Sequence, residues 1–310
     1  MKIIKMDDFK DFSSFESNKR LKLFSKDLFF DEILDNINSN LLESEKLIEK
    51  QFEANNSYPS ILVISSPRTG STYLTQLLAS KFNISYVSNL MSKFYNVPSI
   101  GAFLQKKMIN IEDMKKTNVF QSLHGNTANI YEPSEFGYFW ARHFNFGQNH
   151  HEPEEEDLKK INFKKLNKEL ENISKVFETP VLYKCSIAPF LFKQILYETN
   201  VFVIVLNRNK KDTVSSILKT RKERFGNYDT WWSIRPLGFE SMQKEKPVIQ
   251  VQWQYDQIYK SLNDYDKNKY LNRVYNCNYE DLVKSPLDEL NSIAKQYLIY
   301  TGLNINTNEK

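Results

Sequence analysis

The sequence predicts an α/β fold in which a central parallel sheet is flanked by helices and a helical segment precedes the core. Two short apolar runs carry this prediction, at residues 61–65 and 201–206, because strands buried on both faces of a parallel sheet form nearly continuous hydrophobic stretches. Each run is followed by a short polar loop and a stretch with helical apolar spacing. Two such strand, loop and helix units favour a parallel sheet.

The remaining elements are predicted from weaker patterns. Residues 1–57 contain neither Gly nor Pro and alternate charged and apolar positions, which predicts helices packed against the main body. Further helices are predicted at residues 71–79, 152–175 and 212–221, and further strands at residues 84–87, 181–183 and 273–277.

No hinge divides the chain, which has only 8 Gly and 10 Pro in 310 residues. We therefore expect one domain over residues 1–310, with a helical N-terminal extension at residues 1–57 and a core at residues 58–303.

Composition excludes several classes of protein. With 41% hydrophobic and 26% charged residues, disorder and coiled coil fit poorly. The net charge of +4 is spread along the chain, so nucleic acid is not an expected partner. The two cysteines, Cys185 and Cys277, are too few for a disulfide framework. Charged residues interrupt the N-terminal residues before an apolar segment can form, and no stretch of the chain approaches the about 18 apolar residues of a membrane span. We therefore expect a cytoplasmic protein without a membrane span.

The loop after the first apolar run has the features of an anion site. A strand-to-helix turn presents backbone N–H groups and the positive end of a helix dipole. Gly70 lets the backbone approach an anion, Arg68 adds a permanent charge, and the hydroxyls of Thr69, Ser71 and Thr72 can donate hydrogen bonds. The loop is not a Walker P-loop, because Ser71 stands where that motif needs Lys. A plain turn with a helix N-cap is the alternative.

A second signal follows the second apolar run. Arg208 stands at the end of that predicted strand, and Ser216 lies eight residues later on the following helix. Both can face a point beyond the carboxyl end of the sheet, where open α/β folds bind ligands. Taken singly, a solvated Arg and a surface Ser would explain them, so their conjunction carries the prediction.

Together these segments resemble the sulfotransferases that use 3′-phosphoadenosine 5′-phosphosulfate (PAPS). Residues 66–74 are similar to the family's 5′-phosphosulfate loop in the version with Arg in place of Lys, and residues 203–216 to its 3′-phosphate motif. Residues 279–283 resemble the late Tyr-Glu-Asp-Leu element, whose Tyr lies near the adenine. The resemblance covers residues 60 to 303 and implies a nucleotide-binding core. It implies these cofactor-binding residues: Arg68, Thr69, Gly70, Ser71, Thr72, Tyr73, Arg208, Ser216 and Tyr279.

The chain departs from the family in its catalytic segment. Lys184 matches a Lys that lies near the transferring sulfonate in cytosolic members, but Ser186 occupies the place of their catalytic His. The C-terminal Arg-Lys-Gly loop of those enzymes has no match. The resemblance therefore implies a role for Arg68 and Lys184 in stabilising developing charge, but leaves the general base unassigned.

Three residues are candidates for that base: His124, Glu132 and Glu135. They lie in a stretch rich in aromatic residues whose Gly and Pro interruptions suggest a pocket wall. A His titrates near neutral pH, whereas a Glu needs an apolar surround to raise its pKa. Each also has an ordinary reading, as a turn residue, a solvated loop residue or a residue at a helix start.

Two other groups of residues invite interpretation. The run from His150 to Glu156 could suggest a metal, but adjacent ligands converge poorly on one ion and acids suit a helix N-terminus, so we expect no metal. Trp231, Trp232 and Arg235 fall where they could cover an acceptor pocket, although aromatic residues are as often core.

The function that the resemblance implies is transfer of a sulfonate group from PAPS to a hydroxyl or amine, releasing 3′,5′-ADP. The acceptor is expected to be a small molecule, a lipid or a carbohydrate, and no more is readable because fold does not fix substrate. Two alternatives remain: a P-loop kinase or NTPase, and a non-catalytic nucleotide-binding protein of the same fold.

Overall fold

The structure is a computed structural model of the chain, and it describes residues 19–25, 27–109, 122–123, 126–127, 129–144, 146 and 150–306. Its centre is a five-stranded sheet with strand order β2-β5-β1-β6-β7, in which every pairing is parallel. The strands are β1 (Ile61–Ser65), β2 (Ser85–Tyr86), β5 (Val181–Lys184), β6 (Phe202–Asn207) and β7 (Val274–Asn278). A separate antiparallel pair joins β3 (Ser122–Leu123) to β4 (Asn126–Thr127).

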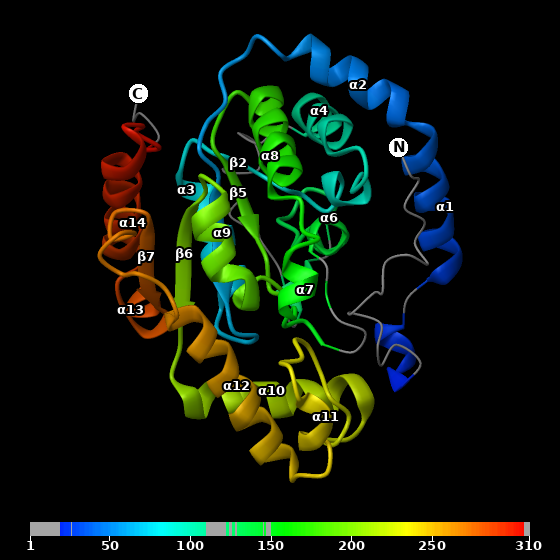
Figure 1. Cartoon of the computed structure of the whole chain (residues 1–310), viewed down its shortest axis with the longest axis vertical. Helices are drawn as coiled ribbons and strands as arrows, with labels where there is room; N and C mark the ends of the chain where they lie inside the picture. Colours follow the sequence, from blue (N-terminus) through cyan, green and yellow to red (C-terminus); the bar gives the residue numbers. More distant parts are fainter. Residues whose placement is uncertain are drawn as a thin grey trace.

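The described helices cover both faces of the sheet and one of its ends (Figure 1). They are α1 (Leu28–Asn40), α2 (Leu42–Gln51), α3 (Ser71–Lys81), α4 (Pro98–Met108), α6 (Gly137–His143), α7 (Glu155–Leu158), α8 (Phe163–Phe177), α9 (Phe192–Glu198), α10 (Lys210–Phe225), α11 (Phe239–Met242), α12 (Pro247–Asn263), α13 (Tyr279–Lys284) and α14 (Pro286–Thr301). Short 3-10 turns occur at Lys22–Phe24, Met91–Lys93 and Pro189–Leu191.

The alternation of side chains along β1 divides the core into two layers. Leu62 and Ile64 belong to the cluster that includes residues of α4, α6, α8, α9 and α12. Ile61 and Val63 belong to the cluster on the other face, formed with α3, α13 and α14. All five residues of β1 are buried, as expected for the central strand of a sheet covered on both sides.

The N-terminal helices α1 and α2 run along one side of the molecule (Figure 1). Asp27 caps α1 by accepting a hydrogen bond from the backbone N–H of Phe30. The buried Glu45 of α2 accepts hydrogen bonds from the backbone N–H groups of Ser99 and Ile100, at distances of 2.8 and 2.9 Å. This carboxylate therefore satisfies the free N–H groups in the first turn of α4 and fastens α2 to the main body.

Figure 1 shows α10, α11 and α12 grouped beyond one end of the sheet. Helix α10 begins directly after β6, and Asn209 caps it by accepting hydrogen bonds from the backbone N–H groups of Lys211 and Asp212. The carboxyl end of the sheet therefore faces the group formed by α10–α12, and the space between them is where a ligand is expected.

The parallel sheet and its flanking helices confirm the predicted fold class, and each predicted strand is present within one or two residues. The single helix predicted over residues 152–175 is wrong: α7 ends at Leu158, and Asn162 starts α8 by accepting a hydrogen bond from the backbone N–H of Lys165. Of the predicted helical segment at residues 1–57, residues 1–18 and 26 lie outside the described part. No helix in the described ranges has both the length and the apolar character needed to cross a membrane.

Candidate active site

A cavity of about 850 Å³ opens at the carboxyl end of the sheet. It is lined by the residues at which the central strands end: Ser65 at the end of β1 and Ser66 after it, Lys184 and Cys185 at the end of β5, and Arg208 after β6. Helices α3, α6 and α10 also contribute side chains to its wall. Its position agrees with the general place of ligand sites in open α/β sheets.

The loop between β1 and α3 is held in an unusual backbone conformation. Arg68 has φ 65° and Gly70 has φ 93°, both in the left-handed region. A Cβ atom on Gly70 would lie 2.4 Å from two ring carbons of Tyr279, so only glycine fits there. Strain of this kind is retained where the surrounding structure fixes it, and it is common at functional sites.

The side chains of this loop divide into two groups. Those of Ser71, Thr72 and Tyr73 stand on the first turn of α3 and line the cavity. The Thr69 hydroxyl is instead fully buried and donates a hydrogen bond to the carbonyl oxygen of Ser66 at 2.8 Å. Its hydroxyl therefore stabilises the loop, which differs from the direct contact with a ligand that the sequence suggested.

The two arginines predicted to bind phosphate meet at one side of the cavity. Arg208 donates a hydrogen bond from Nη1 to the carbonyl oxygen of Arg68 at 2.9 Å, and its guanidinium lies 4.5 Å from the centre of the Tyr279 ring. Arg68 donates from Nε to the Ser216 hydroxyl at 3.1 Å. Residues from four separate segments, Arg68, Arg208, Ser216 and Tyr279, thus form one contiguous group.

The electrostatics of this group favour an anion. Burial lowers the pKa of the Arg68 guanidinium. The negative charge of Glu223 opposes this shift, and the like charge of Arg208 adds to it. The Arg208 Nε is buried and has no hydrogen-bond partner among the described residues. A bound anion would relieve the repulsion between the two guanidinium groups.

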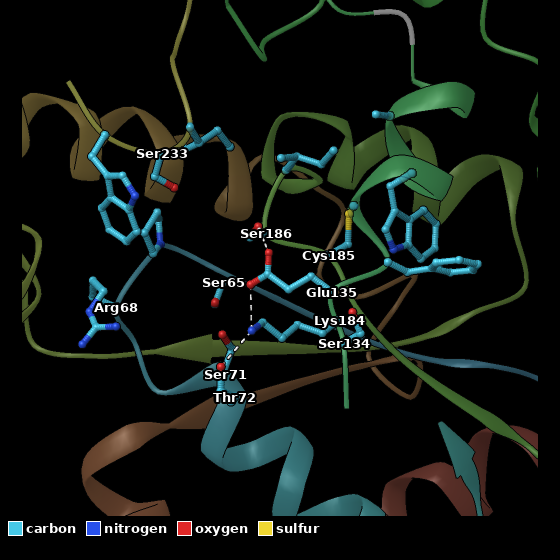
Figure 2. A pocket seen from close by; sticks show the side chains of 18 of the residues that line it. Ser65, Arg68, Ser71, Thr72, Ser134, Glu135, Lys184, Cys185, Ser186 and Ser233 are labelled. Atoms are coloured by element: carbon cyan, nitrogen blue, oxygen red, sulfur yellow. Dashed lines mark hydrogen bonds and ion pairs between the residues drawn. The ribbon is translucent and has the colours of Figure 1, made fainter. Parts of the chain in front are cut away.

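Lys184 connects the loop to the candidate base. Its side chain is 6% exposed, and the ammonium donates to the Thr72 hydroxyl at 2.8 Å and forms an ion pair with Glu135 at 2.7 Å (Figure 2). The Ser186 hydroxyl donates to the other carboxylate oxygen of Glu135 at 2.9 Å. Figure 2 shows this chain of contacts inside the cavity, with the Arg68 side chain pointing away from Lys184 and Glu135.

The surroundings of Glu135 keep its carboxyl group ionised. Burial acts to raise the pKa of this carboxyl, but the charge of Lys184 and the hydrogen bonds from Lys184 and Ser186 outweigh that effect and hold the pKa below its usual value. The sequence reasoning expected an apolar surround to raise the pKa of a catalytic Glu, and for Glu135 that expectation is wrong because two polar partners contact the carboxylate.

The structure separates the three candidate bases. Of these, Glu135 lines the cavity. Glu132 has no exposed surface and is absent from the cavity wall; its carboxylate accepts hydrogen bonds from the backbone and side-chain N–H groups of Asn129. His124 lies outside the described residues.

Several cavity residues were missed or given little weight by sequence reasoning. Arg20, His151 and Arg224 line the cavity, as do Trp231, Trp232 and Arg235. Arg224 was missed because the predicted helix ended at residue 221, whereas α10 continues to Phe225 and so carries Arg224. The others come from loops, whose approach to the site no local pattern indicates.

His150 and His151 have structural partners. The backbone N–H of Arg235 donates to His151 Nδ1 at 2.8 Å, and His150 Nδ1 lies 2.6 Å from the carbonyl oxygen of Glu152. Acidic residues occupy the first turn of α7, as the sequence suggested. Across the described ranges, no three or more His, Cys, Asp or Glu residues are grouped so that they could hold a metal ion.

The fold is an α/β fold with a parallel sheet, and a loop with two left-handed residues follows its central strand β1. The sequence profile of the sulfotransferase domain family matches residues 58–298, and the chain belongs to this family. No curated protein sequence shows a significant match.

Among solved structures, the chain is similar in fold to sulfotransferase STF1 from Mycobacterium tuberculosis H37Rv, at TM-score 0.57 and 14% identity over 95% of this chain and 87% of that one. Sulfotransferase STF9 from Mycobacterium avium matches at TM-score 0.52 and 12% identity, over 86% of this chain and 70% of that one. At these identities the likeness concerns the fold.

Proposed function

We propose that this sulfotransferase uses PAPS as donor and transfers its sulfonate group to a hydroxyl or amine of a small-molecule, lipid or carbohydrate acceptor, releasing 3′,5′-ADP. The observation that carries the proposal is the continuous chain of contacts from Thr72 through Lys184 to Glu135. It places a cation and a carboxylate beside the anion-binding loop, in a cavity whose other side holds the arginine pair. Bound PAPS would supply the electrophilic sulfur and a leaving phosphate.

The residues of the chain fit such a donor at two places. The N–H groups at the start of α3 and the hydroxyls of Ser71 and Thr72 suit a phosphosulfate. Arg208, with its unpartnered Nε, and Ser216 suit a second phosphate nearby. The Tyr279 ring, which packs on Arg208, offers an aromatic surface for a purine base.

Three side chains would carry the chemistry. Lys184 reaches Thr72 and so holds a positive charge where negative charge develops on the transferring group. Glu135 is ionised and can accept the proton of an acceptor hydroxyl. Ser186 orients the Glu135 carboxylate through its hydrogen bond and itself carries no proton between acceptor and base.

Calorimetric titration of the purified chain with 3′,5′-ADP, 5′-ADP and ATP with Mg²⁺ tests the donor. We expect 3′,5′-ADP to bind without metal and more tightly than 5′-ADP. Arg68→Ala and Arg208→Ala should each weaken binding by roughly 1.5–3 kcal/mol, because each removes a charge-assisted contact. Lys219→Ala is the matched control, since it removes an exposed cation of α10 that does not line the cavity.

The two alternatives give different results. Preference for ATP with Mg²⁺ would favour a kinase, and 3′,5′-ADP binding without sulfonate transfer from PAPS to any acceptor would favour a non-catalytic protein. Unchanged 3′,5′-ADP affinity in both arginine variants would overturn the proposed donor site.

A further inference from the structure

The cavity contains a cation that the proposed donor site does not use. Arg224 stands in the last turn of α10 and is 8% exposed, and its guanidinium lies 5.0 Å from the centre of the Phe24 ring and 5.6 Å from that of Trp232. Phe24 and Trp232 line the same cavity, from the N-terminal segment and from the loop after α10. Arg224 is therefore held by aromatic packing at a defined place in the wall.

The Arg224 side chain has no partner of opposite charge within the described part of the chain. It makes no hydrogen bond or ion pair there, and its buried Nε is unpartnered. Glu135 is near enough to influence its pKa but does not pair with it. Burial lowers the pKa of Arg224 to about 10, and the positive charges of Arg20 and Arg68 contribute to the same shift.

Two other arginines of the chain with little exposed surface differ from Arg224 in having hydrogen-bond partners for the guanidinium group. Arg221 has no exposed surface and donates from Nη1 to the carbonyl oxygen of Tyr228 at 3.2 Å and to Gln250 Oε1 at 2.7 Å. The Arg142 side chain is 5% exposed and forms a two-point contact with the carboxylate of Glu169. Leaving a desolvated guanidinium unpaired costs free energy, and structures rarely do so without a partner that completes the site. The Arg224 position is therefore better explained by a ligand than by stability.

The excess of positive charge on the cavity wall also favours a negatively charged ligand. Seven Lys and Arg side chains line it, against two carboxylates: Arg20, Arg68, Lys93, Lys184, Arg208, Arg224 and Arg235, with Asp31 and Glu135. The proposed donor engages Arg68, Lys184 and Arg208. Arg20, Lys93, Arg224 and Arg235 remain. Of these, Arg20 influences the pKa of Arg224 and Arg224 that of Glu135, and neither arginine pairs with a carboxylate in the described part of the chain.

We propose that the acceptor carries an oxyanion, a carboxylate or a phosphate or sulfate ester, which binds the Arg224 guanidinium with support from Arg20 while the acceptor hydroxyl lies against Glu135. This inference rests on the proposed function, because it places the acceptor between Arg224 and the candidate base. It makes Arg224 a specificity-determining residue: charged acceptors gain a charge-assisted contact, and uncharged ones leave the buried guanidinium unpaired.

The direct test is calorimetric titration with sodium sulfate at constant ionic strength, with and without saturating 3′,5′-ADP. In the nucleotide-loaded protein we expect one saturable sulfate site, weakened about 10- to 100-fold by Arg224→Gln, as removal of a charge-assisted contact predicts. The matched control is Lys219→Gln, which removes one exposed cation of the same helix and should leave sulfate affinity unchanged. Arg20→Gln, at a less buried position, should weaken it several-fold and serves if Arg224→Gln does not fold.

Two results would overturn the inference: no saturable sulfate site in the nucleotide-loaded protein, or equal sulfate affinity in Arg224→Gln and Lys219→Gln. If 3′,5′-ADP itself fails to bind, the proposed function fails. The titrations without nucleotide still judge the Arg224 site, through the difference between the two variants.

The chemical class is resolved by competition against sulfate. The probes are 4-hydroxybenzoate, 4-hydroxyphenyl phosphate and the uncharged 4-hydroxybenzamide. Tighter competition by the carboxylate or by the phosphate ester assigns that group to the acceptor. Competition by the amide equal to that of both anions would contradict recognition of charge.

Discussion

Replacing Glu135 by Gln removes the candidate base while keeping the size of the side chain. In the structure, one Glu135 oxygen lies 2.7 Å from the Lys184 ammonium and the other 2.9 Å from the Ser186 hydroxyl, so the amide can keep one of these contacts. It cannot accept a proton at neutral pH. Loss of a positioned general base lowers kcat by about 10²- to 10⁴-fold, and we expect a loss in that range.

Affinity for 3′,5′-ADP separates catalysis from binding in this variant. Glu135 does not contact the group formed by Arg68, Arg208, Ser216 and Tyr279, and Lys184 keeps its hydrogen bond to Thr72. We therefore expect Glu135→Gln to bind 3′,5′-ADP as the wild type does, measured by calorimetry, while single-turnover transfer from PAPS is slowed. Transfer at the wild-type rate would refute the assignment of the base.

Glu132→Gln provides the comparison, since Glu132 is the other glutamate of the same segment and its carboxylate binds Asn129 outside the cavity wall. A larger fall in kcat in Glu132→Gln than in Glu135→Gln would show that the base had been placed at the wrong residue.

The pH profile tests the same reasoning. Because Lys184 and Ser186 hold the Glu135 pKa below its usual 4.5, the carboxylate form persists through neutral pH and is lost only as pH falls through that lowered pKa. The profile of kcat/KM reports the free enzyme, so its acid limb should lie below pH 4.5. In the complex, the anionic oxygens of the bound donor would compete with Glu135 for the Lys184 ammonium. The acid limb of kcat should therefore lie at higher pH than that of kcat/KM. An acid limb of kcat at or below that of kcat/KM would contradict this coupling.

Three further predictions concern the framework of the site. Gly70→Ala should weaken 3′,5′-ADP binding and lower the free energy of unfolding by about 1–3 kcal/mol, because alanine is strained at a positive φ and its Cβ meets the Tyr279 ring. Calorimetry and denaturant unfolding measure the two effects, and unchanged values would contradict this reasoning. Burial raises the pKa of Glu45 to about 7, so its stabilising contribution is full below pH 4.5 and lost as pH rises through 7. Glu45→Gln loses one acceptor oxygen at every pH, but its free energy of unfolding relative to the wild type should rise by up to about 3 kcal/mol from pH 4 to pH 8 in denaturant unfolding. Burial lowers the pKa of His151 to about 3, so the stability from this group is present above pH 6.5 and falls by about 1.4 kcal/mol per pH unit below it. In His151→Asn, which can still accept from the Arg235 N–H, the free energy of unfolding should fall less steeply as pH is lowered. An equally steep fall would exclude His151 as the cause.

The fold was predictable where the sequence signal is local. The runs that became β1 and β6 are buried on both faces, so nearly every residue is apolar, and this produced the clearest pattern in the chain. The break between α7 and α8 was missed because the acidic and apolar residues on both sides continue a helical spacing. The start of α8 is set by the Asn162 side chain, whose capping bond competes with continuation of the helix.

The candidate donor loop was predictable for the same reason, since its residues are consecutive. The orientation of each side chain was not. Arg68 and Gly70, which flank Thr69, both have left-handed backbone conformations, and the Thr69 hydroxyl therefore points toward the Ser66 carbonyl. The composition of the loop does not indicate either conformation. Arg224 escaped notice because a cation near a helix C-terminus has an ordinary explanation in the helix dipole, and only the cavity shows where its guanidinium lies.

The sequence alone could not decide between Glu132 and Glu135 as the candidate base. Glu132 and Glu135 are three residues apart among similar aromatic neighbours, and the choice between them depends on Ser186, 51 residues further along the chain. The left-handed Phe136, with φ 54°, immediately follows Glu135 and turns the chain into α6. The Ser186 hydroxyl lies 2.9 Å from the Glu135 carboxylate, so the side chain at position 186 contacts a carboxylate from a distant segment. The residue that departs from the family resemblance therefore contacts the candidate base, which comes from a different segment, while Lys184 contacts both that carboxylate and Thr72.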